Sequence, residues 1–324
     1  MKVFVTGGNG FIGSVVVRKL VERGDTVRCL LRPTSKTDRI ADLPFERATG
    51  DVCDAASVRA GMDGCDGVIH LASLSNWNDI HSPRMPAVVV GGTKNVLEAA
   101  SVVGRPRTVF VSTSTAVNAT TTPIAQNEDS AMTLPLDKFV YVKAKLEGER
   151  MCREYAAQGL PVTIVNPAEV YGPKDYEQIT AGNLIDFAKS NPVMVSEGGT
   201  SVVHVDDVAT GMLAALDKGQ PGQRYILGGD NLTIRQLAEL TMNILGQKKP
   251  VVGMPSPVLR ALGWMGSNLK IPMPFNPAIV PYAVLYWFMD NSKARRDLGV
   301  TFRPAREVLV PTLEWINEYF LHKK

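Results

Sequence analysis

The chain has 324 residues, of which 45% are apolar and 21% are charged, and its formal net charge is +3. This length exceeds one ordinary core, so we expect one large domain with a smaller lobe. The small net charge gives no reason to expect a nucleic-acid partner. Glycine and proline make up about 15% of the residues, which excludes a low-complexity or collagen-like chain.

The cysteines and the N-terminus predict a protein of a reducing compartment. The cysteines form no CxxC pair, and a chain of this size needs no disulfide; they are Cys29, Cys53, Cys65 and Cys152. The first residues contain no apolar signal core. The longest apolar run, 279–289, has eleven residues, whereas a membrane-spanning helix needs about 20. We therefore expect a cytoplasmic protein.

Short β-branched runs alternate with helical patterns in the first half of the chain. The runs predict strands at 2–6, 26–31, 45–49, 67–71, 108–112 and 162–165. The helical patterns cover 11–23, a segment from Asp54 as N-cap to about 62, 87–103 and 139–157. This alternation indicates βαβ units, and therefore an α/β fold with a doubly wound parallel sheet covered on both faces.

After Pro173 the pattern changes. Helices are predicted at 181–189, 234–245 and 305–321, and strands at 202–205 and 224–227. Repeated prolines between 251 and 281 leave little room for regular structure. We expect a dinucleotide-binding domain over 1–173, with its sheet revisited by about 201–229. The remainder, 174–200 and 230–324, would form a smaller substrate-binding lobe.

A glycine-rich loop joins the first strand to the first helix, with the sequence Thr6-Gly7-Gly8-Asn9-Gly10-Phe11-Ile12-Gly13. Gly7 permits the tight turn, Gly10 lets the backbone approach a pyrophosphate, and Gly13 lets the helix pack on the strand. The positive end of the helix would then face the phosphates. This context predicts a dinucleotide site.

The residue that closes the second strand bears on which nicotinamide cofactor binds. Sites for a cofactor without a 2′-phosphate usually have an acidic residue there, but this chain has Arg32, with Lys36 close behind. A guanidinium can grip a phosphate, so we expect NADP(H), with NAD(H) as the alternative. Arg32 could also be an ordinary solvated arginine. Asp51 is placed to meet the adenine, and the backbone of Ala72 to pass close to the cofactor.

Tyr141 and Lys145 are spaced i, i+4, which places them on one helix face. A nearby cation lowers the pKa of a tyrosine, so such a pair can transfer a proton near neutral pH. A cluster of hydroxyl residues, 112–115, ends the fifth strand. His70, at another strand end, is more typical of a hydrogen-bonded core residue than of a catalyst. No cluster has metal-ligand spacing, so no metal is expected.

With these motifs the chain resembles the extended short-chain dehydrogenase/reductases, also described as the NAD-dependent epimerase/dehydratase family. The resemblance covers nearly the whole chain. It rests on the loop from Thr6 to Gly13, Gly50-Asp51, His70-Leu71-Ala72, Tyr141-x-x-x-Lys145, Asn166-Pro167-x-x-Val170-Tyr171-Gly172-Pro173 and His204-Val205-Asp206-Asp207. Within the family, the segments 31–35, 225–229 and 292–299 are most similar to the dihydroflavonol reductase branch.

The resemblance implies a Rossmann-type fold and assigns roles. Tyr141 would be the general acid/base, and Lys145 would hold the nicotinamide ribose and tune Tyr141. Thr113, with Ser114 as the alternative, would hydrogen-bond the substrate oxygen. Further cofactor contacts would come from Phe11, Ile12, Val52, Leu71, Ser112, Pro167 and Val170. Substrate contacts would come from Asn118 and Tyr171, although Asn118 could equally be a turn residue.

Two departures from the family pattern bear on function. Val89 stands where the family usually has an asparagine in the helix before the fifth strand. Nucleotide-sugar members usually have Arg-Asp just before the His-Val-x-Asp segment, but this chain has Thr200-Ser201-Val202-Val203. Without that arginine to pair with a diphosphate, a nucleotide-sugar substrate is disfavoured.

The C-terminal portion is rich in methionine, tryptophan and proline, and three interpretations remain open. Its apolar residues could close the core of the smaller lobe, form a lid over a hydrophobic substrate, or contact a membrane surface through 279–289. The resemblance also implies a homodimer through the helices that begin near 87 and 139. The sequence offers as exposed candidates Val88, Val96, Val142 and Met151.

Three functions compete at this stage. The favoured one is an NADPH-dependent oxidoreductase that reduces a carbonyl, or oxidises the alcohol, of a small and largely apolar substrate. The second is an NAD-dependent sugar epimerase or dehydratase. The third is a cofactor-binding regulator without chemistry, against which the intact Thr113, Tyr141 and Lys145 argue.

Overall fold

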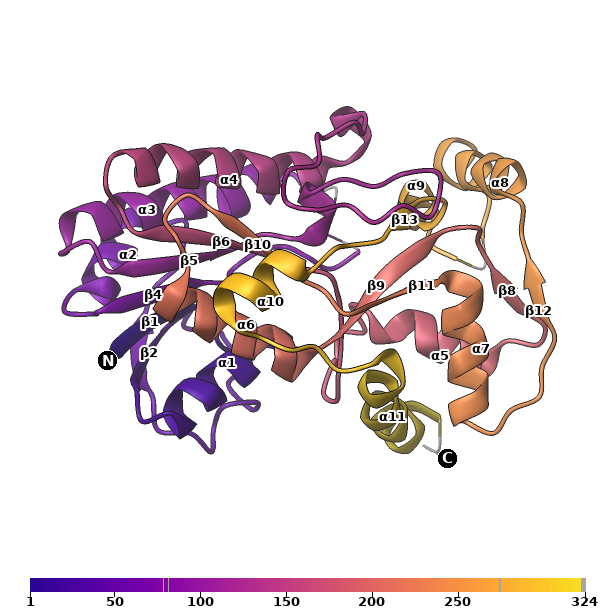
Figure 1. Ribbon diagram of the computed structural model, residues 1–324, viewed down its shortest axis with the longest axis horizontal. Coiled ribbons are helices and arrows are strands. Elements are labelled where there is room, and N and C mark those ends of the chain that lie inside the picture. Colours follow the sequence, from indigo (N-terminus) through magenta and orange to yellow (C-terminus); the bar gives the residue numbers. More distant parts are fainter. Residues whose placement is uncertain (78, 81, 274, 322–324) are drawn as a thin grey trace.

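The computed structural model describes residues 1–77, 79–80, 82–273 and 275–321, and within them seven parallel strands form a central sheet (Figure 1). Their order is β3-β2-β1-β4-β5-β6-β10, so the chain moves outward in both directions from β1. The strands span Lys2–Thr6 (β1), Thr26–Leu31 (β2), Glu46–Thr49 (β3), Gly67–His70 (β4), Arg107–Val111 (β5), Val162–Pro167 (β6) and Arg224–Leu227 (β10). This is the doubly wound Rossmann-type sheet that the alternation predicted.

Three helices cover each face of this sheet (Figure 1). One face carries α1 (Phe11–Glu22), α6 (Val205–Lys218) and α10 (Ser292–Leu298), and the other carries α2 (Ala55–Met62), α3 (Gly92–Val102) and α4 (Val140–Ala157). Successive strand residues point to opposite faces, so both faces of β1 are apolar. Val3 and Val5 pack with α1, whereas Phe4 packs with α2.

The predicted helix over 87–103 differs in its first turns. Residues Pro86–Gly91 form a π-helix that leads into α3. Val89 is buried there and packs with Met85 and Ala144 against α4. Apolar packing therefore joins this segment to α4 at the position where the family usually has an asparagine.

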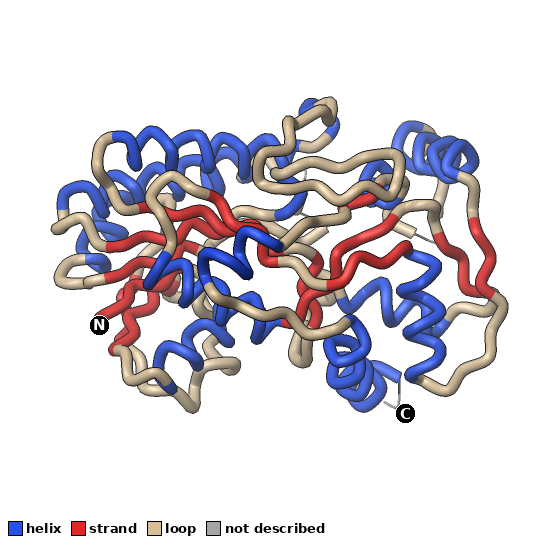
Figure 2. The backbone as a smooth tube through the Cα atoms, in the orientation of Figure 1, coloured by secondary structure: helices blue, strands red, loops and turns tan. Residues whose placement is uncertain are grey.

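A second, smaller lobe is built around two further sheets (Figure 2). Within the described residues, β9 (Gly199–His204) pairs with β7 (Glu169–Tyr171), β11 (Asp230–Thr233) and β13 (Tyr286–Trp287), and β8 (Val193–Val195) pairs with β12 (Val251–Gly253). The strand predicted near 202–205 is thus not in the central sheet, to which the chain returns with α6 and β10 and again with α10. The helices of this lobe are α5 (Ala181–Lys189), α7 (Ile234–Ile244), α8 (Ser256–Asn268), α9 (Val280–Ala283) and α11 (Ala305–Ile316).

The expectation of little regular structure between 251 and 281 is wrong. Residues Ser256–Asn268 form α8, a helix of 13 residues. Its prolines stand before the helix and in its first turn, where no intrahelical N–H is required, so they favour the start of a helix instead of breaking one.

The apolar run 279–289 lies inside the protein. Tyr282, Trp287 and Met289 are buried, with Phe139 in the same cluster, so this run forms core and not a membrane contact. In the described part of the chain, no helix is both long and apolar enough to cross a bilayer.

The side chains offered for a dimer interface are also buried within the chain. Val96 and Val142 are 1% and 0% exposed, and Val88 and Met151 are 8% and 7% exposed. They pack against the sheet or neighbouring helices, which leaves little or none of their surface for a second copy. A homodimer remains a prediction from the resemblance, without support from these residues.

Candidate active site

A cavity of about 1440 Å³ runs along the carboxyl ends of the central strands and into the smaller lobe. Ligands of doubly wound folds bind at this edge, where the strand order reverses between β1 and β4. Most predicted site residues line the cavity: Gly7, Gly10, Phe11, Ile12, Gly13, Arg32, Asp51, Val52, Leu71, Ala72, Ser112, Thr113, Ser114, Tyr141, Lys145, Pro167 and Val170. Lys36, Asn118 and Tyr171 lie outside it.

The glycine-rich loop fits a pyrophosphate. Gly7 has φ +71°, and a Cβ there would lie 2.9 Å from the amide nitrogen of Ala72. A Cβ on Gly13 would lie 2.1 Å from the carbonyl oxygen of Gly7, so only glycine allows α1 to begin this close to β1. Among the described residues, no side chain caps α1, and its first turn has no acidic residue. Its free N–H groups can therefore receive an anion.

His70 holds this loop in place and is not a catalyst. Its Nδ1 lies 2.7 Å from Thr6 Oγ1, and its Nε2 lies 3.2 Å from Thr93 Oγ1. Thr6 Oγ1 also accepts a hydrogen bond from the Ala72 N–H at 3.2 Å. Burial lowers the pKa of His70 to about 3, so the ring is neutral. The interpretation of His70 as a hydrogen-bonded core residue is confirmed.

At the end expected to hold the adenosine, Arg32 is exposed and lines the cavity. The Arg47 guanidinium donates to the carbonyl of Arg32 at 2.9 Å, which adds a second cation beside the end of β2. Asp51 Oδ1 accepts from the Cys53 N–H at 2.9 Å. Lys36 contributes through its backbone, since its carbonyl accepts from the Asn9 side chain at 2.9 Å.

Tyr141 and Lys145 project from α4 toward the cavity. The Lys145 side chain is buried, and its Nζ donates to the carbonyl of Val111 at 2.8 Å and lies 5.9 Å from the centre of the Tyr141 ring. Burial lowers the pKa of Lys145 to about 8, although Glu149 and Cys152 oppose this change. Burial also raises the pKa of Tyr141 to about 12, so the expected lowering by Lys145 does not prevail. The loss of water around the Tyr141 hydroxyl thus has a larger effect on its pKa than Lys145, whose ammonium group is already hydrogen-bonded to the carbonyl of Val111.

Two neighbouring hydroxyl side chains affect the Tyr141 hydroxyl. The Thr113 and Ser73 side chains both act to lower the pKa of Tyr141 by hydrogen bonding, which partly offsets its burial. Ser73 Oγ has no well-formed hydrogen bond among the described residues. Ser114 also lines the cavity but is buried at the start of a short 3-10 helix, which Thr113 caps. Of Thr113 and Ser114, only Thr113 is among the groups that affect the pKa of Tyr141.

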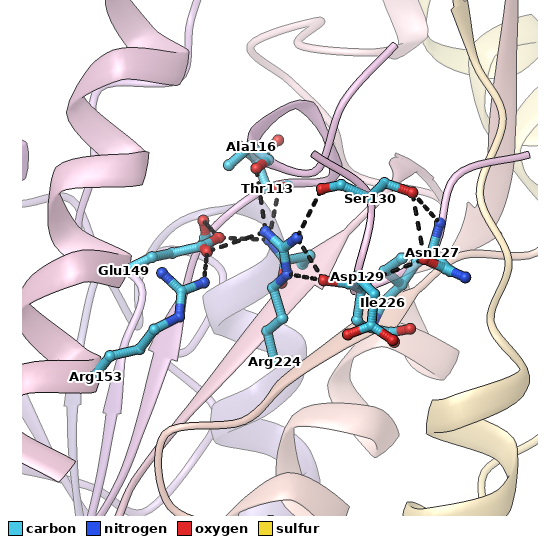
Figure 3. A network of polar contacts seen from close by, with 12 residues as sticks. Thr113, Ala116, Asn127, Asp129, Ser130, Glu149, Arg153, Arg224 and Ile226 are labelled. Carbon is cyan, nitrogen blue, oxygen red and sulfur yellow. Dashed lines mark hydrogen bonds and ion pairs between the residues drawn. The ribbon is translucent and has the colours of Figure 1, made fainter. Parts of the chain in front are cut away.

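The sequence analysis missed a buried carboxylate, Glu149, which is the centre of a polar network (Figure 3). Glu149, one turn after Lys145, is 0% exposed and accepts from Ser112 Oγ and Asn166 Nδ2, both at 2.7 Å. The same amide nitrogen of Asn166 donates to the carbonyl of Thr113 at 2.9 Å. Glu149 thus positions the residues that end β5 and β6.

Two arginines complete the network around Glu149 (Figure 3). Arg153 lies 2.7 Å and Arg224 3.4 Å from Glu149 Oε2. Arg224 also donates to the carbonyls of Ala116 at 3.4 Å and Glu128 at 2.8 Å. Arg224 therefore ties β10 to the loop that follows Thr113. The i, i+4 spacings of Glu149 with Lys145 and with Arg153 were sequence signals for this role.

The predicted substrate contacts at Asn118 and Tyr171 are not what the structure shows. Asn118 is 4% exposed, and its side chain bonds Gln126 and Thr133 to hold a loop, which is the turn role left open for it. Tyr171 is 0% exposed, and its hydroxyl donates to Glu169 Oε1 at 2.8 Å.

Glu169 lines the cavity instead, as do Asn183 and Thr200. Its Oε1 also accepts from Asn183 Nδ2 at 2.9 Å. Burial raises the pKa of Glu169, which favours its neutral form. Asn183 Oδ1 is buried without a partner among the described residues. Asn183 Oδ1 can therefore accept a hydrogen bond from a bound molecule, and Glu169 is a second polar group that such a molecule can contact.

Aromatic residues close the cavity beside Tyr141. Tyr282 and Trp287 line it and stack at 5.7 Å between ring centroids, and Phe139 meets Tyr282 edge-on at 4.8 Å. Leu259, Phe275 and Val280 extend this apolar wall. The 279–289 segment is thus both core and cavity wall.

Together, the fold and the site define an NAD(P)-dependent oxidoreductase. A family model described as "NAD dependent epimerase/dehydratase family" matches residues 3–228. The chain belongs to this family, the extended short-chain dehydrogenase/reductases.

Individual relatives carry both reductase and epimerase names. The chain is 29% identical to a "putative dihydroflavonol 4-reductase" of Synechocystis, covering 98% of this chain and 94% of that protein. It is 31% identical to the "4-hydroxy-2-methyl-3-oxo-4-farnesyl-3,4-dihydroquinoline-1-oxide ketoreductase" of Stigmatella aurantiaca, covering 95% and 94%. A crystal structure described as a nucleoside-diphosphate-sugar epimerase from Pseudomonas aeruginosa superposes with a TM-score of 0.81 at 25% identity, covering 99% and 98%.

Proposed function

We propose that the protein is an NADPH-dependent reductase of a carbonyl on a small, largely apolar substrate, or the corresponding alcohol dehydrogenase. The observation that carries this proposal is the charge of the substrate end of the cavity. From Pro167 onward, the described lining residues include no lysine or arginine. Their acidic residues are held in other ways, since Glu177 pairs with Arg39 and burial raises the pKa of Glu169 and of Asp186. A nucleotide-sugar diphosphate would therefore find no cation to pair with among these lining residues.

The apolar wall of the same region supports the choice of substrate. Pockets lined by aliphatic and aromatic side chains bind apolar molecules and use a few polar groups for orientation. Glu169 and Asn183 would be such groups, suited to a hydroxyl or carbonyl on the substrate. The names of the two reductase relatives agree with this class, whereas the epimerase-like structure keeps the second candidate in the test.

Cofactor preference is part of the proposal. Arg32 would pair with the 2′-phosphate of NADPH, and the glycine-rich loop with α1 would hold the pyrophosphate. Lys145 would hold the nicotinamide ribose. When bound, the cofactor supplies the hydride.

Tyr141 and Thr113 would act on the substrate oxygen. Both hydroxyls would donate to it, and both bonds would strengthen as negative charge grows there, so they stabilise the transition state more than the ground state. With a pKa of about 12, Tyr141 rests in the neutral form that a proton donor requires. The Lys145 ammonium would stabilise the phenolate left after Tyr141 gives up its proton.

The test is a screen of NADPH oxidation over ketones, aldehydes and keto-sugars, with nucleotide sugars tested separately for epimerisation. We expect stoichiometric NADPH oxidation with an apolar ketone or aldehyde. Tyr141→Phe should lower turnover by about 100-fold or more. Tyr155→Phe is the matched control, because Tyr155 lies on α4 outside the cavity lining. Epimerisation without net oxidation, or full activity of Tyr141→Phe, would overturn the proposal.

A further inference from the structure

Exposed apolar side chains are concentrated on α8 and on the residues just before and just after it in the chain. Of the eleven large apolar side chains exposed among the described residues, five lie within the twenty positions from 252 to 271. Trp264 is 59% exposed and Leu269 is 57% exposed; the others are Val252, Val258 and Ile271. Scattered exposed apolar residues need no explanation, but a cluster of this kind marks an interaction surface.

The charge of this part of the chain is one-sided. From Leu240 to Met289, fifty residues contain no aspartate or glutamate, although the average of 32 acidic residues in 324 would place about five there. The same stretch contains Lys248, Lys249, Arg260 and Lys270. Arg260 and Lys270 are exposed among the five apolar side chains. These seven residues are called the α8 patch.

The α8 patch lies over the apolar end of the cavity. Leu259 and Leu262, on the inner side of α8, line the cavity, whereas Val258 and Trp264 on the same helix are exposed. Figure 1 shows α8 at the outer edge of the smaller lobe, away from the central sheet. One helix therefore separates the cavity from whatever covers the patch.

We propose that the α8 patch docks on an anionic lipid surface, with α8 lying in the plane of the interface. Tryptophan favours the headgroup level of a bilayer, and lysine and arginine are attracted to anionic headgroups. An outer face with both features, on a helix of only 13 residues, suits surface binding and not insertion across the bilayer.

A second copy of the chain fits this surface less well than lipid does. A two-fold interface would bring the patch against itself and place Arg260 and Lys270 opposite like charges. The stretch holds no carboxylate to neutralise them, and Glu197, which lies against the start of α8, already accepts two hydrogen bonds from Ser256. An anionic bilayer supplies those negative charges. The docking inference rests on the patch alone and holds whichever substrate the cavity takes.

The experiment measures co-sedimentation of the intact protein with vesicles of 70% phosphatidylcholine and 30% phosphatidylglycerol. We expect binding at low salt that weakens as salt rises and is lost on pure phosphatidylcholine. Trp264→Ser/Leu269→Ser should lower the partition coefficient by about 10-fold or more. Arg260→Glu/Lys270→Glu should lower the partition coefficient by more than this, since each cation near such a surface contributes a factor of about five to binding.

Matched variants on the other lobe keep the test specific. Val102→Ser removes an equally exposed apolar side chain from α3, and Arg59→Glu/Lys94→Glu reverses two charges on α2 and α3. Neither should change binding. Equal losses in these controls, no binding by the unaltered protein, or a dimer that Trp264→Ser/Leu269→Ser dissociates would each overturn the proposal.

A measurement on the unaltered protein covers the case in which a patch variant fails to fold. Brominated phosphatidylglycerol quenches tryptophans that enter the interface. The protein has four tryptophans, all of them described by the structure, and Trp264 is the one whose side chain is strongly exposed. We expect quenching in vesicles, and unchanged emission would contradict docking through α8.

Discussion

Replacing Glu149 by glutamine tests whether the buried network positions the active site. Glu149 is 0% exposed. Its carboxylate accepts hydrogen bonds from the side chains of Ser112 and Asn166 and forms ion pairs with Arg153 and Arg224. Breaking a buried ion pair costs about 3–5 kcal/mol, but the Arg153 side chain is 45% exposed and solvent screens its share. We therefore expect a loss of about 2–4 kcal/mol, a large fraction of the 5–15 kcal/mol typical of a folded protein.

Thermal unfolding followed by circular dichroism measures this loss. A change of 1 kcal/mol shifts the Tm of a long chain by about 2 °C, so Glu149→Gln should unfold about 4–8 °C below the unaltered protein. Glu154→Gln is the control, because Glu154 lies on the exposed side of the same helix and, among the described residues, its carboxylate pairs with the exposed Arg150 alone. It should unfold at the unaltered temperature.

Glu149→Gln also distinguishes a role in positioning the active-site residues from a role in binding the cofactor. Glu149 accepts a hydrogen bond from Asn166, and Asn166 donates to the carbonyl of Thr113. Loss of the Glu149 carboxylate should therefore displace the Thr113 hydroxyl, which we propose to bind the substrate oxygen. We expect kcat to fall by about 10- to 100-fold, with a much smaller change in the Kd for NADPH. An unchanged Tm together with an unchanged kcat would refute the positioning role.

The other predictions concern cofactor, catalysis and pH. NADPH should bind about 10- to 100-fold more tightly than NADH, and Arg32→Asp should abolish this preference in fluorescence titrations; equal binding by the unaltered protein would contradict it. Lys145→Met should weaken NADPH binding and lower turnover, whereas Lys143→Met, on the exposed side of α4, should change neither. The folded-state pKa of His70 is about 3, against an ordinary value of 6.5, so stability present above pH 6.5 is lost as the pH falls from 6.5 toward 3. His70→Gln should therefore show a smaller drop in Tm between pH 7.5 and pH 4.5; an identical drop would count against a neutral buried histidine.

Much of the central sheet was predictable because its signals are local. Each buried strand is a short β-branched run, and each covering helix repeats its apolar residues at helical spacing. The signal of the glycine-rich loop is equally local. Gly7 is required by the turn and Gly13 by the start of the helix, and these two positions are only a few residues apart. Tyr141 and Lys145 were found because one helix carries both.

Failures of prediction arose where distant segments meet. Asn118 was open to two interpretations until Gln126 and Thr133 were seen to bind its side chain. The prolines near 255 were misinterpreted because their effect depends on whether a helix begins or continues there. The apolar residues Val96 and Val142 could face a partner or the sheet, and only packing distinguishes these cases.

The chemistry of the site also has a part that local sequence predicts and a part that depends on contacts between distant residues. Residue types and short spacings suffice to indicate a dinucleotide, a proton-transferring tyrosine and an oxidoreductase, because those functions use contiguous motifs. The charge of the substrate end, the burial that raises the pKa of Tyr141, and the convergence of Arg153 and Arg224 on Glu149 depend on residues far apart in the chain. Desolvation and electrostatics act through space, so they exist only once the sheet, α4 and the smaller lobe have packed together.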